Sequence, residues 1–404
     1  METNELVTIL NGFFGWNKAR MKCFAGMLIA LIKVRTVNLT ELACAFGSKA
    51  KLESRYKRIK RFFKQFTIDF SCIAFWVMSL FGLLNTPVYL SMDRTNWRWG
   101  KKDINILMLS VVYKGIALPI FWSLLPKFGN SDTKERIDLI NRFIARFGKE
   151  VIAGILADRE FIGDDWIGWL LREKIPFCIR IKNNTITTNS RGLEVDIDTL
   201  FYDLKPGEQR ILQDKRKLWK QKVYLSALRL SDGELLIVAT DKLLENPILL
   251  YGKRWQIETL FGCLKSKGFG FEETRITKPD RIEKLLVLLT VAFCWAHKIG
   301  EWRHEEKAIS VKKHGRKLQS YFRYGLDHVR DILLNEMHQT KVKLSNLLSL
   351  LAINGNLLDT VLLPRNLKVV IPEKADIQYQ PLWMPAFAGM TCGFVNLATS
   401  TTIM

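Results

Sequence analysis

The chain has 404 residues, with 61 lysines and arginines against 40 aspartates and glutamates, so its net charge at pH 7 is +21. Hydrophobic residues make up 48% of it, which excludes disorder for most of the chain, and the length predicts two or three domains. The positive excess indicates a polyanionic partner. The longest apolar run, Leu285 to Ala296, is much shorter than the ~20 residues of a membrane-spanning helix. The acidic start, Met1 to Glu5, lacks the features of a secretory signal, so we expect a cytoplasmic protein.

Residues 1–86 are predicted to form a helical domain. Apolar periodicity predicts helices at Met21–Val34 and Leu52–Phe66, and the segment from Asn38 to Glu41 is expected to cap a preceding short helix in a helix-turn-helix-like arrangement. The segment from Lys49 to Lys64 contains eight basic residues and one acidic residue. So one-sided a charge favours contact with the DNA backbone, with a merely solvated charged helix as the alternative.

A helix over this basic segment would bury one face and expose the other. Its apolar stripe would consist of Leu52, Tyr56, Ile59 and Phe63. The residues expected to face DNA include Lys57, Arg58, Lys60 and Arg61.

From residue 87 the pattern changes to an α/β core. The expected elements are strands at 88–94, 104–113 and 116–124, a helix at 133–147, a strand at 151–157, a helix at 166–172 and a strand at 177–181. Three antiparallel strands followed by alternating helices and strands are typical of an RNase H-like core. We therefore predict an α/β protein with such a core, whose first part covers residues 87–182.

The rest of the chain is predicted to interrupt, complete and extend this core. Residues 183–234 are polar and strand-prone and indicate a β-rich insertion. The second part of the core, 235–303, should contain a strand at 235–239 and one long helix from about 247 to 267. A helical C-terminal region is expected at 304–350, and residues 351–404 are expected to form a poorly ordered tail.

Carboxylates are the candidate catalytic groups, because the first 296 residues contain no histidine. Asp93 is placed at the end of the first core strand and Asp158 directly after the strand 151–157, where α/β sheets bind ligands. The helix at 247–267 adds a polar stripe composed of Tyr251, Arg254, Glu258 and Lys265. An i,i+4 salt bridge between Arg254 and Glu258 is the structural alternative, but an anionic ligand shared by the two cations explains the stripe better.

These motifs resemble the DDE transposases of bacterial insertion sequences, in the IS-four branch that carries the YREK signature. The signature is Tyr, two residues, Arg, three residues, Glu, six residues and Lys, which Tyr251, Arg254, Glu258 and Lys265 match. The resemblance implies that Asp93, Asp158 and Glu258 hold two Mg²⁺ ions, or Mn²⁺, for phosphoryl transfer. It also implies that Tyr251, Arg254 and Lys265 contact phosphates near the cleaved end.

The resemblance further implies the partners and the reaction. The expected function is cut-and-paste transposition near the bacterial nucleoid, in which a homodimer pairs terminal inverted repeats of double-stranded DNA, cleaves them and joins the 3′ ends to target DNA. An aromatic residue of the insertion holds a flipped base in this branch, and Trp219 is the candidate here, with ordinary packing as the alternative. Arg159 and Glu160 either support Asp158 or pair with each other. An RNase H-like nuclease without strand transfer and an inactive DNA-binding remnant remain alternatives.

Overall fold

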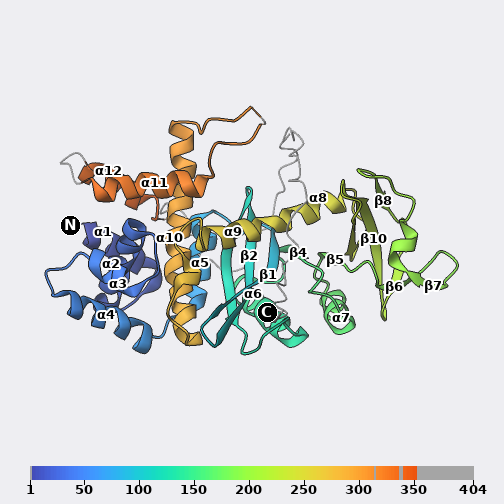
Figure 1. Ribbon diagram of the computed structural model, residues 1–404, viewed down its shortest axis with the longest axis horizontal. Helices are drawn as coiled ribbons and strands as arrows, with labels where there is room; N and C mark the ends of the chain where they lie inside the picture. Colours follow the sequence, from blue (N-terminus) through green and yellow to red (C-terminus); the bar gives the residue numbers. More distant parts are fainter. Residues whose placement is uncertain (1, 314, 336–339, 353–404) are drawn as a thin grey trace, which may run out of the picture.

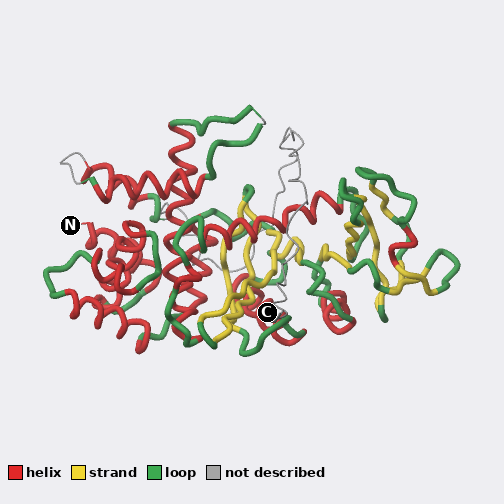
Figure 2. Tube along the Cα trace, viewed as in Figure 1, coloured by secondary structure: helices red, strands yellow, loops and turns green. Residues whose placement is uncertain are grey.

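The structure, a computed structural model, describes residues 2–313, 315–335 and 340–352. Its first part is helical, as predicted, and lies at the left of Figures 1 and 2. The helices are α1 (Glu2–Phe14), α2 (Lys18–Val34), α3 (Leu39–Ala45), α4 (Leu52–Gln65) and α5 (Phe70–Leu80). Asn38 caps α3, the helix that follows it and not one that precedes it, because its side chain accepts a hydrogen bond from the Thr40 amide at 2.9 Å.

A mixed sheet forms the middle of the molecule. Its strands are β1 (Val88–Trp99), β2 (Lys102–Tyr113), β3 (Ile116–Leu124), β4 (Ile152–Ala157), β5 (Phe177–Ile181) and β11 (Leu235–Thr240). They are ordered β3-β2-β1-β4-β5-β11, with β1, β4 and β5 parallel and the others antiparallel to their neighbours. In Figure 1, α6 (Thr133–Phe147) and α7 (Asp164–Arg172) lie below the strands. The α/β character predicted for this part is confirmed.

The insertion is β-rich, as predicted, but it is not separate from this sheet. Its elements are β6 (Ile186–Thr188), β7 (Glu194–Asp196), a 3₁₀ turn η1 (Ile197–Leu200), β8 (Gln209–Ile211), β9 (Arg216–Leu218) and β10 (Gln221–Arg229). β10 pairs with β11, and β8 pairs with β10, so both extend the core sheet. Only β6 and β7 form a two-stranded sheet of their own among the described residues.

One long helix, α10 (Pro279–Glu306), joins the helical part to the sheet. It contacts α2, α4 and α5 as well as β3, and its central turns are buried. α11 (Tyr321–Leu334) crosses α10, and α12 (Thr340–Ser349) packs beside α1 and α11, so a helical C-terminal region is confirmed. The expected tail lies mostly outside the described residues. Among the described helices none is long and apolar enough to span a membrane alone; α2 and α3 together pass that test but are bent by 100°.

The crossing of α10 and α11 depends on two glycines. A Cβ added at Gly300 would lie 1.8 Å from the carbonyl oxygen of Tyr321, and one added at Gly325 would lie 1.8 Å from that of Ala296. The two backbones are therefore in direct contact, and neither helix has room for a methyl group there.

Replacing Gly300 or Gly325 with alanine should therefore destabilise the protein by at least about 1–3 kcal/mol, because the helices must separate. Gly12 in α1 is the matched control, since a Cβ added there meets no described atom within 4 Å. Gly12→Ala should leave stability unchanged or raise it by about 0.5–1 kcal/mol. Thermal unfolding of the three variants measures the difference, and equal shifts in Tm would contradict the close crossing.

Candidate active site

Asp93 and Asp158 lie next to each other on neighbouring strands. The expectation that Asp93 ends its strand was wrong, because β1 continues to Trp99. However, the parallel pairing of β1 with β4 ends at Met92 opposite Ala157, so each aspartate is the next residue after the last pair. Each also accepts a 2.7 Å hydrogen bond at Oδ1 from the following backbone N–H. The sheet therefore brings the two carboxylates together.

The helix expected over 247–267 is broken into three pieces. These are α8 (Pro247–Gly252), a 3₁₀ turn η2 (Lys253–Trp255) and α9 (Gln256–Leu264), which cross above the strands in Figure 1. The break nevertheless leaves Tyr251, Arg254 and Glu258 facing the aspartates. The Tyr251 hydroxyl donates to Asp158 Oδ1 at 3.3 Å.

Arg254 is the centre of this site. Its Nη1 donates to Asp93 Oδ2 at 3.1 Å and its Nη2 donates to Glu258 Oε1 at 2.7 Å, so one guanidinium bridges two of the three carboxylates. The i,i+4 pair between Arg254 and Glu258 therefore does form, contrary to our preference for a shared external anion. The guanidinium also lies over the Trp255 ring, with Cζ 4.8 Å from the ring centroid.

Lys265 does not share the polar stripe with these residues. It follows the last residue of α9, with φ −87° and ψ −131°, because the helix ends before it. Its Nζ pairs with Glu272 Oε1 at 2.5 Å and lies 5.6 Å from the centroid of the Trp97 ring. The predicted single stripe was therefore wrong for Lys265, which lies toward the far end of β1.

Burial sets the electrostatics of the site. The side chain of Arg254 is only 4% exposed, and that of Asp93 is 16% exposed. Burial raises the pKa of Asp93 to about 7, although Arg254 opposes the shift, and burial also raises the pKa of Glu258. Burial alone would lower the pKa of Arg254, but Tyr251 and the carboxylates around it raise it overall. The guanidinium is thus a fixed positive charge among acids that resist ionisation.

The donor chemistry of the site fits a hard divalent cation. Asp93, Asp158 and Glu258 offer only carboxylate oxygens, which Mg²⁺ and Mn²⁺ prefer. Across residues 2–313, 315–335 and 340–352, no three His, Cys, Asp or Glu side chains are gathered closely enough to hold one ion. Arg254 accounts for this, because it already neutralises Asp93 and Glu258 from between them.

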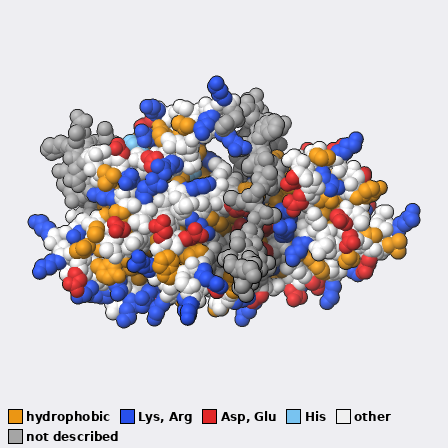
Figure 3. All heavy atoms as spheres, viewed as in Figure 1, with side chains coloured by type: hydrophobic (Ala, Val, Ile, Leu, Met, Phe, Trp, Pro, Cys, Tyr) orange, Lys and Arg blue, Asp and Glu red, His pale blue; other side chains and the backbone are white. Residues whose placement is uncertain are grey.

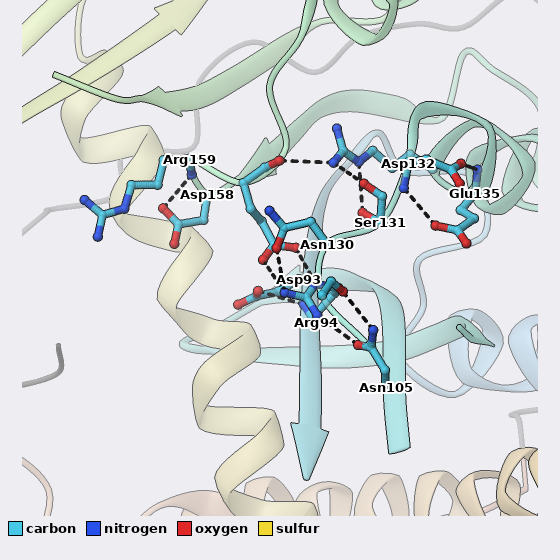
Figure 4. Close-up of polar contacts among 12 residues, drawn as sticks. Asp93, Arg94, Asn105, Asn130, Ser131, Asp132, Glu135, Asp158 and Arg159 are labelled. Carbon is cyan, nitrogen blue, oxygen red and sulfur yellow. Dashed lines mark hydrogen bonds and ion pairs between the residues drawn. The ribbon is translucent and has the colours of Figure 1, made fainter. Parts of the chain in front are cut away.

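A second polar network connects β1, which carries Asp93, to the loop that starts at Asp158 (Figure 4). Arg94 pairs with Glu160 through two bonds of 2.7 and 2.9 Å, and it also donates to the side chains of Asn105 and Asn130. The proposed pairing of Arg159 with Glu160 was wrong, since Arg159 lies nearer Glu234, at 3.7 Å. The residue after Asp93 thus holds the loop after Asp158.

Arg136 of α6 holds the same loop through its backbone carbonyls. Its guanidinium donates to the Ser131 side chain at 2.9 Å and to the carbonyls of Glu160 and Ile162 at 3.0 and 3.3 Å. It is buried, so these bonds satisfy donors that water does not reach. The roles of Arg94 and Arg136 were not predicted from the sequence, in which only the position of Arg94 next to Asp93 indicates such a role.

The basic residues of α4 divide into two groups. Lys57, Lys60 and Arg61 are exposed, and Figure 3 shows Lys and Arg side chains along this lower left edge of the molecule. Arg58 is half-buried, donates to the Ala19 carbonyl at 3.3 Å and lies over the Phe46 ring, so it serves the packing of the helices. The buried stripe also differs from the prediction, since it consists of Ile59, Phe62 and Phe63.

Trp219 lies at the two-residue turn between β9 and β10, with φ +53°. It is half-buried and lines a cavity of about 460 Å³ together with Thr187 of β6 and Ile162. Ile162 belongs to the loop that follows Asp158, so this cavity adjoins the loop that Arg136 fixes.

The coupling between Arg94 and Glu160 should be stronger than that of Arg98 and Asp103, an exposed pair that joins β1 to β2. Their side chains are 12% and 21% exposed, against 68% and 30% for Arg98 and Asp103. A double-mutant cycle with glutamine substitutions should give about 1.5–3 kcal/mol for the first pair and a clearly smaller coupling energy for Arg98→Gln with Asp103→Asn. Chemical denaturation measures both cycles; equal coupling energies would exclude a special role for the inner pair.

Asp93 should make the stability of the metal-free protein depend on pH. Its pKa of about 7 in the folded state exceeds the ordinary value of 3.8, so the folded state holds an extra proton between these values. Its contribution to stability is thus full below about pH 4 and declines as the pH rises to about 7, by up to ~1.4 kcal/mol per pH unit. Denaturation of the wild type and Asp93→Asn across this range should show that the variant lacks this decline. Parallel curves would disprove the assignment.

Comparison with known proteins identifies the domain that carries this site. The family model described as the transposase DDE domain matches residues 85–295, slightly more than half of the chain. No curated protein matches significantly. Among solved structures, the cryo-EM structure of a piggyBac transposase synaptic complex with hairpin DNA is similar, with a TM-score of 0.43, 12% identity and coverage of 85% of this chain and 82% of that one. The match over residues 85–295, which include Asp93, Asp158 and Glu258, shows that the chain belongs to the transposase DDE domain family.

Proposed function

We propose that this protein is the cut-and-paste transposase of a bacterial insertion sequence, of the IS-four family and its YREK branch. It binds the terminal inverted repeats of its element, cleaves the ends and joins the 3′ ends to target DNA as a homodimer. The observation that carries the proposal is the convergence of Asp93, Asp158 and Glu258 around Arg254, inside the segment that matches the family.

The sheet order supports an RNase H-like core for this activity. Three antiparallel strands (β3-β2-β1) continue into the parallel strands β4 and β5, and Asp93 and Asp158 come from the two central neighbours. Glu258 comes from a helix that packs on β1, β2 and β3. The insertion between β5 and β11 separates Asp158 from Glu258 in sequence without separating them in space.

Asp93, Asp158 and Glu258 are the residues that would hold two Mg²⁺ ions. Bound there, the ions would activate the attacking oxygen and stabilise the leaving oxygen of a phosphodiester. Arg254 and Tyr251 keep the three acids in place before DNA and metal arrive. Arg254 is also charged at any working pH, so it can donate to a DNA phosphate when it releases a carboxylate.

The other predicted DNA-binding residues lie outside this cluster. Lys265, beside Trp97 at the end of β1, would contact the DNA backbone further from the cleaved bond. Lys57, Lys60 and Arg61 would contact phosphates from the N-terminal helices, whereas Arg58 supports their packing. Trp219 and its cavity are suited to hold an unstacked base, because the ring lines a space next to the Asp158 loop.

The three acids should each be required for cleavage. Asp93→Asn, Asp158→Asn and Glu258→Gln should each reduce cleavage of a duplex carrying the inverted repeats that flank the gene by at least about a thousandfold in Mg²⁺. Asp165→Asn is the matched control, because Asp165 is an exposed acid in the first turn of α7. Gel analysis of end-labelled DNA measures cleavage.

A strand-transfer assay distinguishes transposition from simple nuclease activity. With pre-cleaved ends and a supercoiled target plasmid, the wild type should form joined products, and the three variants should not. Cleavage without joining would favour a nuclease, and cleavage that survives all three substitutions would contradict the assignment of the site.

A further inference from the structure

A cavity lined by basic residues lies between the N-terminal helices and the start of α10. It has a volume of about 330 Å³, roughly that of ten water molecules. Its cationic lining consists of Lys60, Arg275, Lys278 and Arg281, which we call the basic cradle. The remaining lining residues are neutral, and they include Asn38, Thr40, Tyr56 and Thr277.

The cations of the basic cradle are not neutralised by the protein. None of the four forms an ion pair within the described parts of the chain, and Lys60 only lies over the ring of Tyr56. The Nε of Arg281 is buried without a hydrogen-bond partner. The nearest acid in sequence, Asp280, pairs with Lys284 and does not line the cavity. Four positive charges around one hollow, with a buried donor unsatisfied, indicate an external anion.

The start of α10 adds to this field. α10 has 28 residues and begins at the basic cradle with Lys278 as its N-cap and no side-chain cap. Pro279 has no N–H, and the amides of Arg281 and Ile282 donate to the Lys278 carbonyl, so it is the dipole of α10 that favours an anion at the same place.

Both walls of the basic cradle are held together by hydrogen bonds. On one side the Val37 amide donates to the Phe269 carbonyl at 3.1 Å, and on the other Lys284 Nζ donates to the Phe63 carbonyl at 3.0 Å. α4 and the lower end of α10 accordingly lie side by side in Figures 1 and 2. The hollow is thus formed before any ligand binds.

The segment that carries Arg275 also leads back to the active site. Phe271 packs against Trp97 of β1, with ring centroids 4.8 Å apart, and Lys265 lies over the same Trp97. The segment between the Glu258 helix and the basic cradle is therefore anchored to β1 at Trp97.

We propose that the basic cradle binds consecutive backbone phosphates of duplex DNA and so anchors the transposon end to the N-terminal helices and the catalytic domain at once. This proposal rests on the proposed function, because DNA is its ligand. The basic cradle gives affinity without reading sequence, since phosphate contacts position a duplex but do not specify its bases.

The test compares two triple variants of the full-length protein. Arg275→Gln, Lys278→Gln and Arg281→Gln together remove three cations of the basic cradle. Lys134→Gln, Lys205→Gln and Lys242→Gln remove three exposed lysines elsewhere and cause the same change in net charge. Because Arg281 is partly buried, a double variant of the exposed Arg275 and Lys278 guards against misfolding, and circular dichroism checks the fold of each protein.

Fluorescence anisotropy with a labelled duplex, in EDTA and at several salt concentrations, is the measurement. The variant of the basic cradle should bind at least about tenfold more weakly near 0.1 M salt. The slope of log K against log salt concentration should become shallower by about 0.9 for each phosphate contact removed, while the control triple variant changes little. Equal losses of DNA affinity in both triple variants would contradict the role of the basic cradle and leave the proposed function intact. Failure of the wild type to bind any duplex would instead contradict the proposed function.

A calorimetric titration with ATP, a free polyphosphate, distinguishes the other source of phosphate. If ATP binds the wild type and not the cradle variant, while both bind DNA equally, the basic cradle is a nucleotide site and the proposal is wrong. Weak or absent ATP binding together with the loss of DNA affinity supports the proposal.

Discussion

The bridge that Arg254 forms between Asp93 and Glu258 is the interaction on which the site depends. Three carboxylates close together in a partly buried place repel one another, and burial raises the pKa of Asp93 and of Glu258. A single buried guanidinium neutralises two of them and fixes their separation with directional bonds. Lysine would supply the charge but not the two-pronged geometry, so arginine is the residue that this position requires.

The positions of the two aspartates depend in turn on β1 and on the loop that starts at Asp158. Asp93 and Asp158 start from neighbouring strands in fixed register, but a loop follows Asp158 and could move. Arg94 bonds to the Glu160 side chain and Arg136 bonds to the Glu160 carbonyl, so both arginines hold that loop in place. The position of Asp158 is therefore fixed relative to the sheet. The geometry of the candidate site is thus a property of the sheet and of two arginines outside the three acids.

The same reasoning explains why the helical part is not an independent appendage. α10 is buried against both the N-terminal helices and β3. One hydrogen bond connects α10 to α4, and another connects the 267–273 segment to Val37, just before α3. A DNA duplex that touches α4 is therefore held at a fixed distance from the acids. Rigid coupling of a binding surface to a reaction centre is what orients a bound substrate for chemistry.

The sequence by itself determined the order of helices and strands and the three acids, because periodicity and spacing are local and survive in any packing. Asp93, Asp158, Tyr251, Arg254 and Glu258 were all found in this way. Tertiary structure alone decided what these residues contact: Arg254 bonds to Asp93, 161 positions away, and Glu160 to Arg94, 66 positions away. It also broke the predicted long helix and turned Lys265 toward Glu272, because helix continuity depends on packing against the sheet as well as on the periodicity that suggested it.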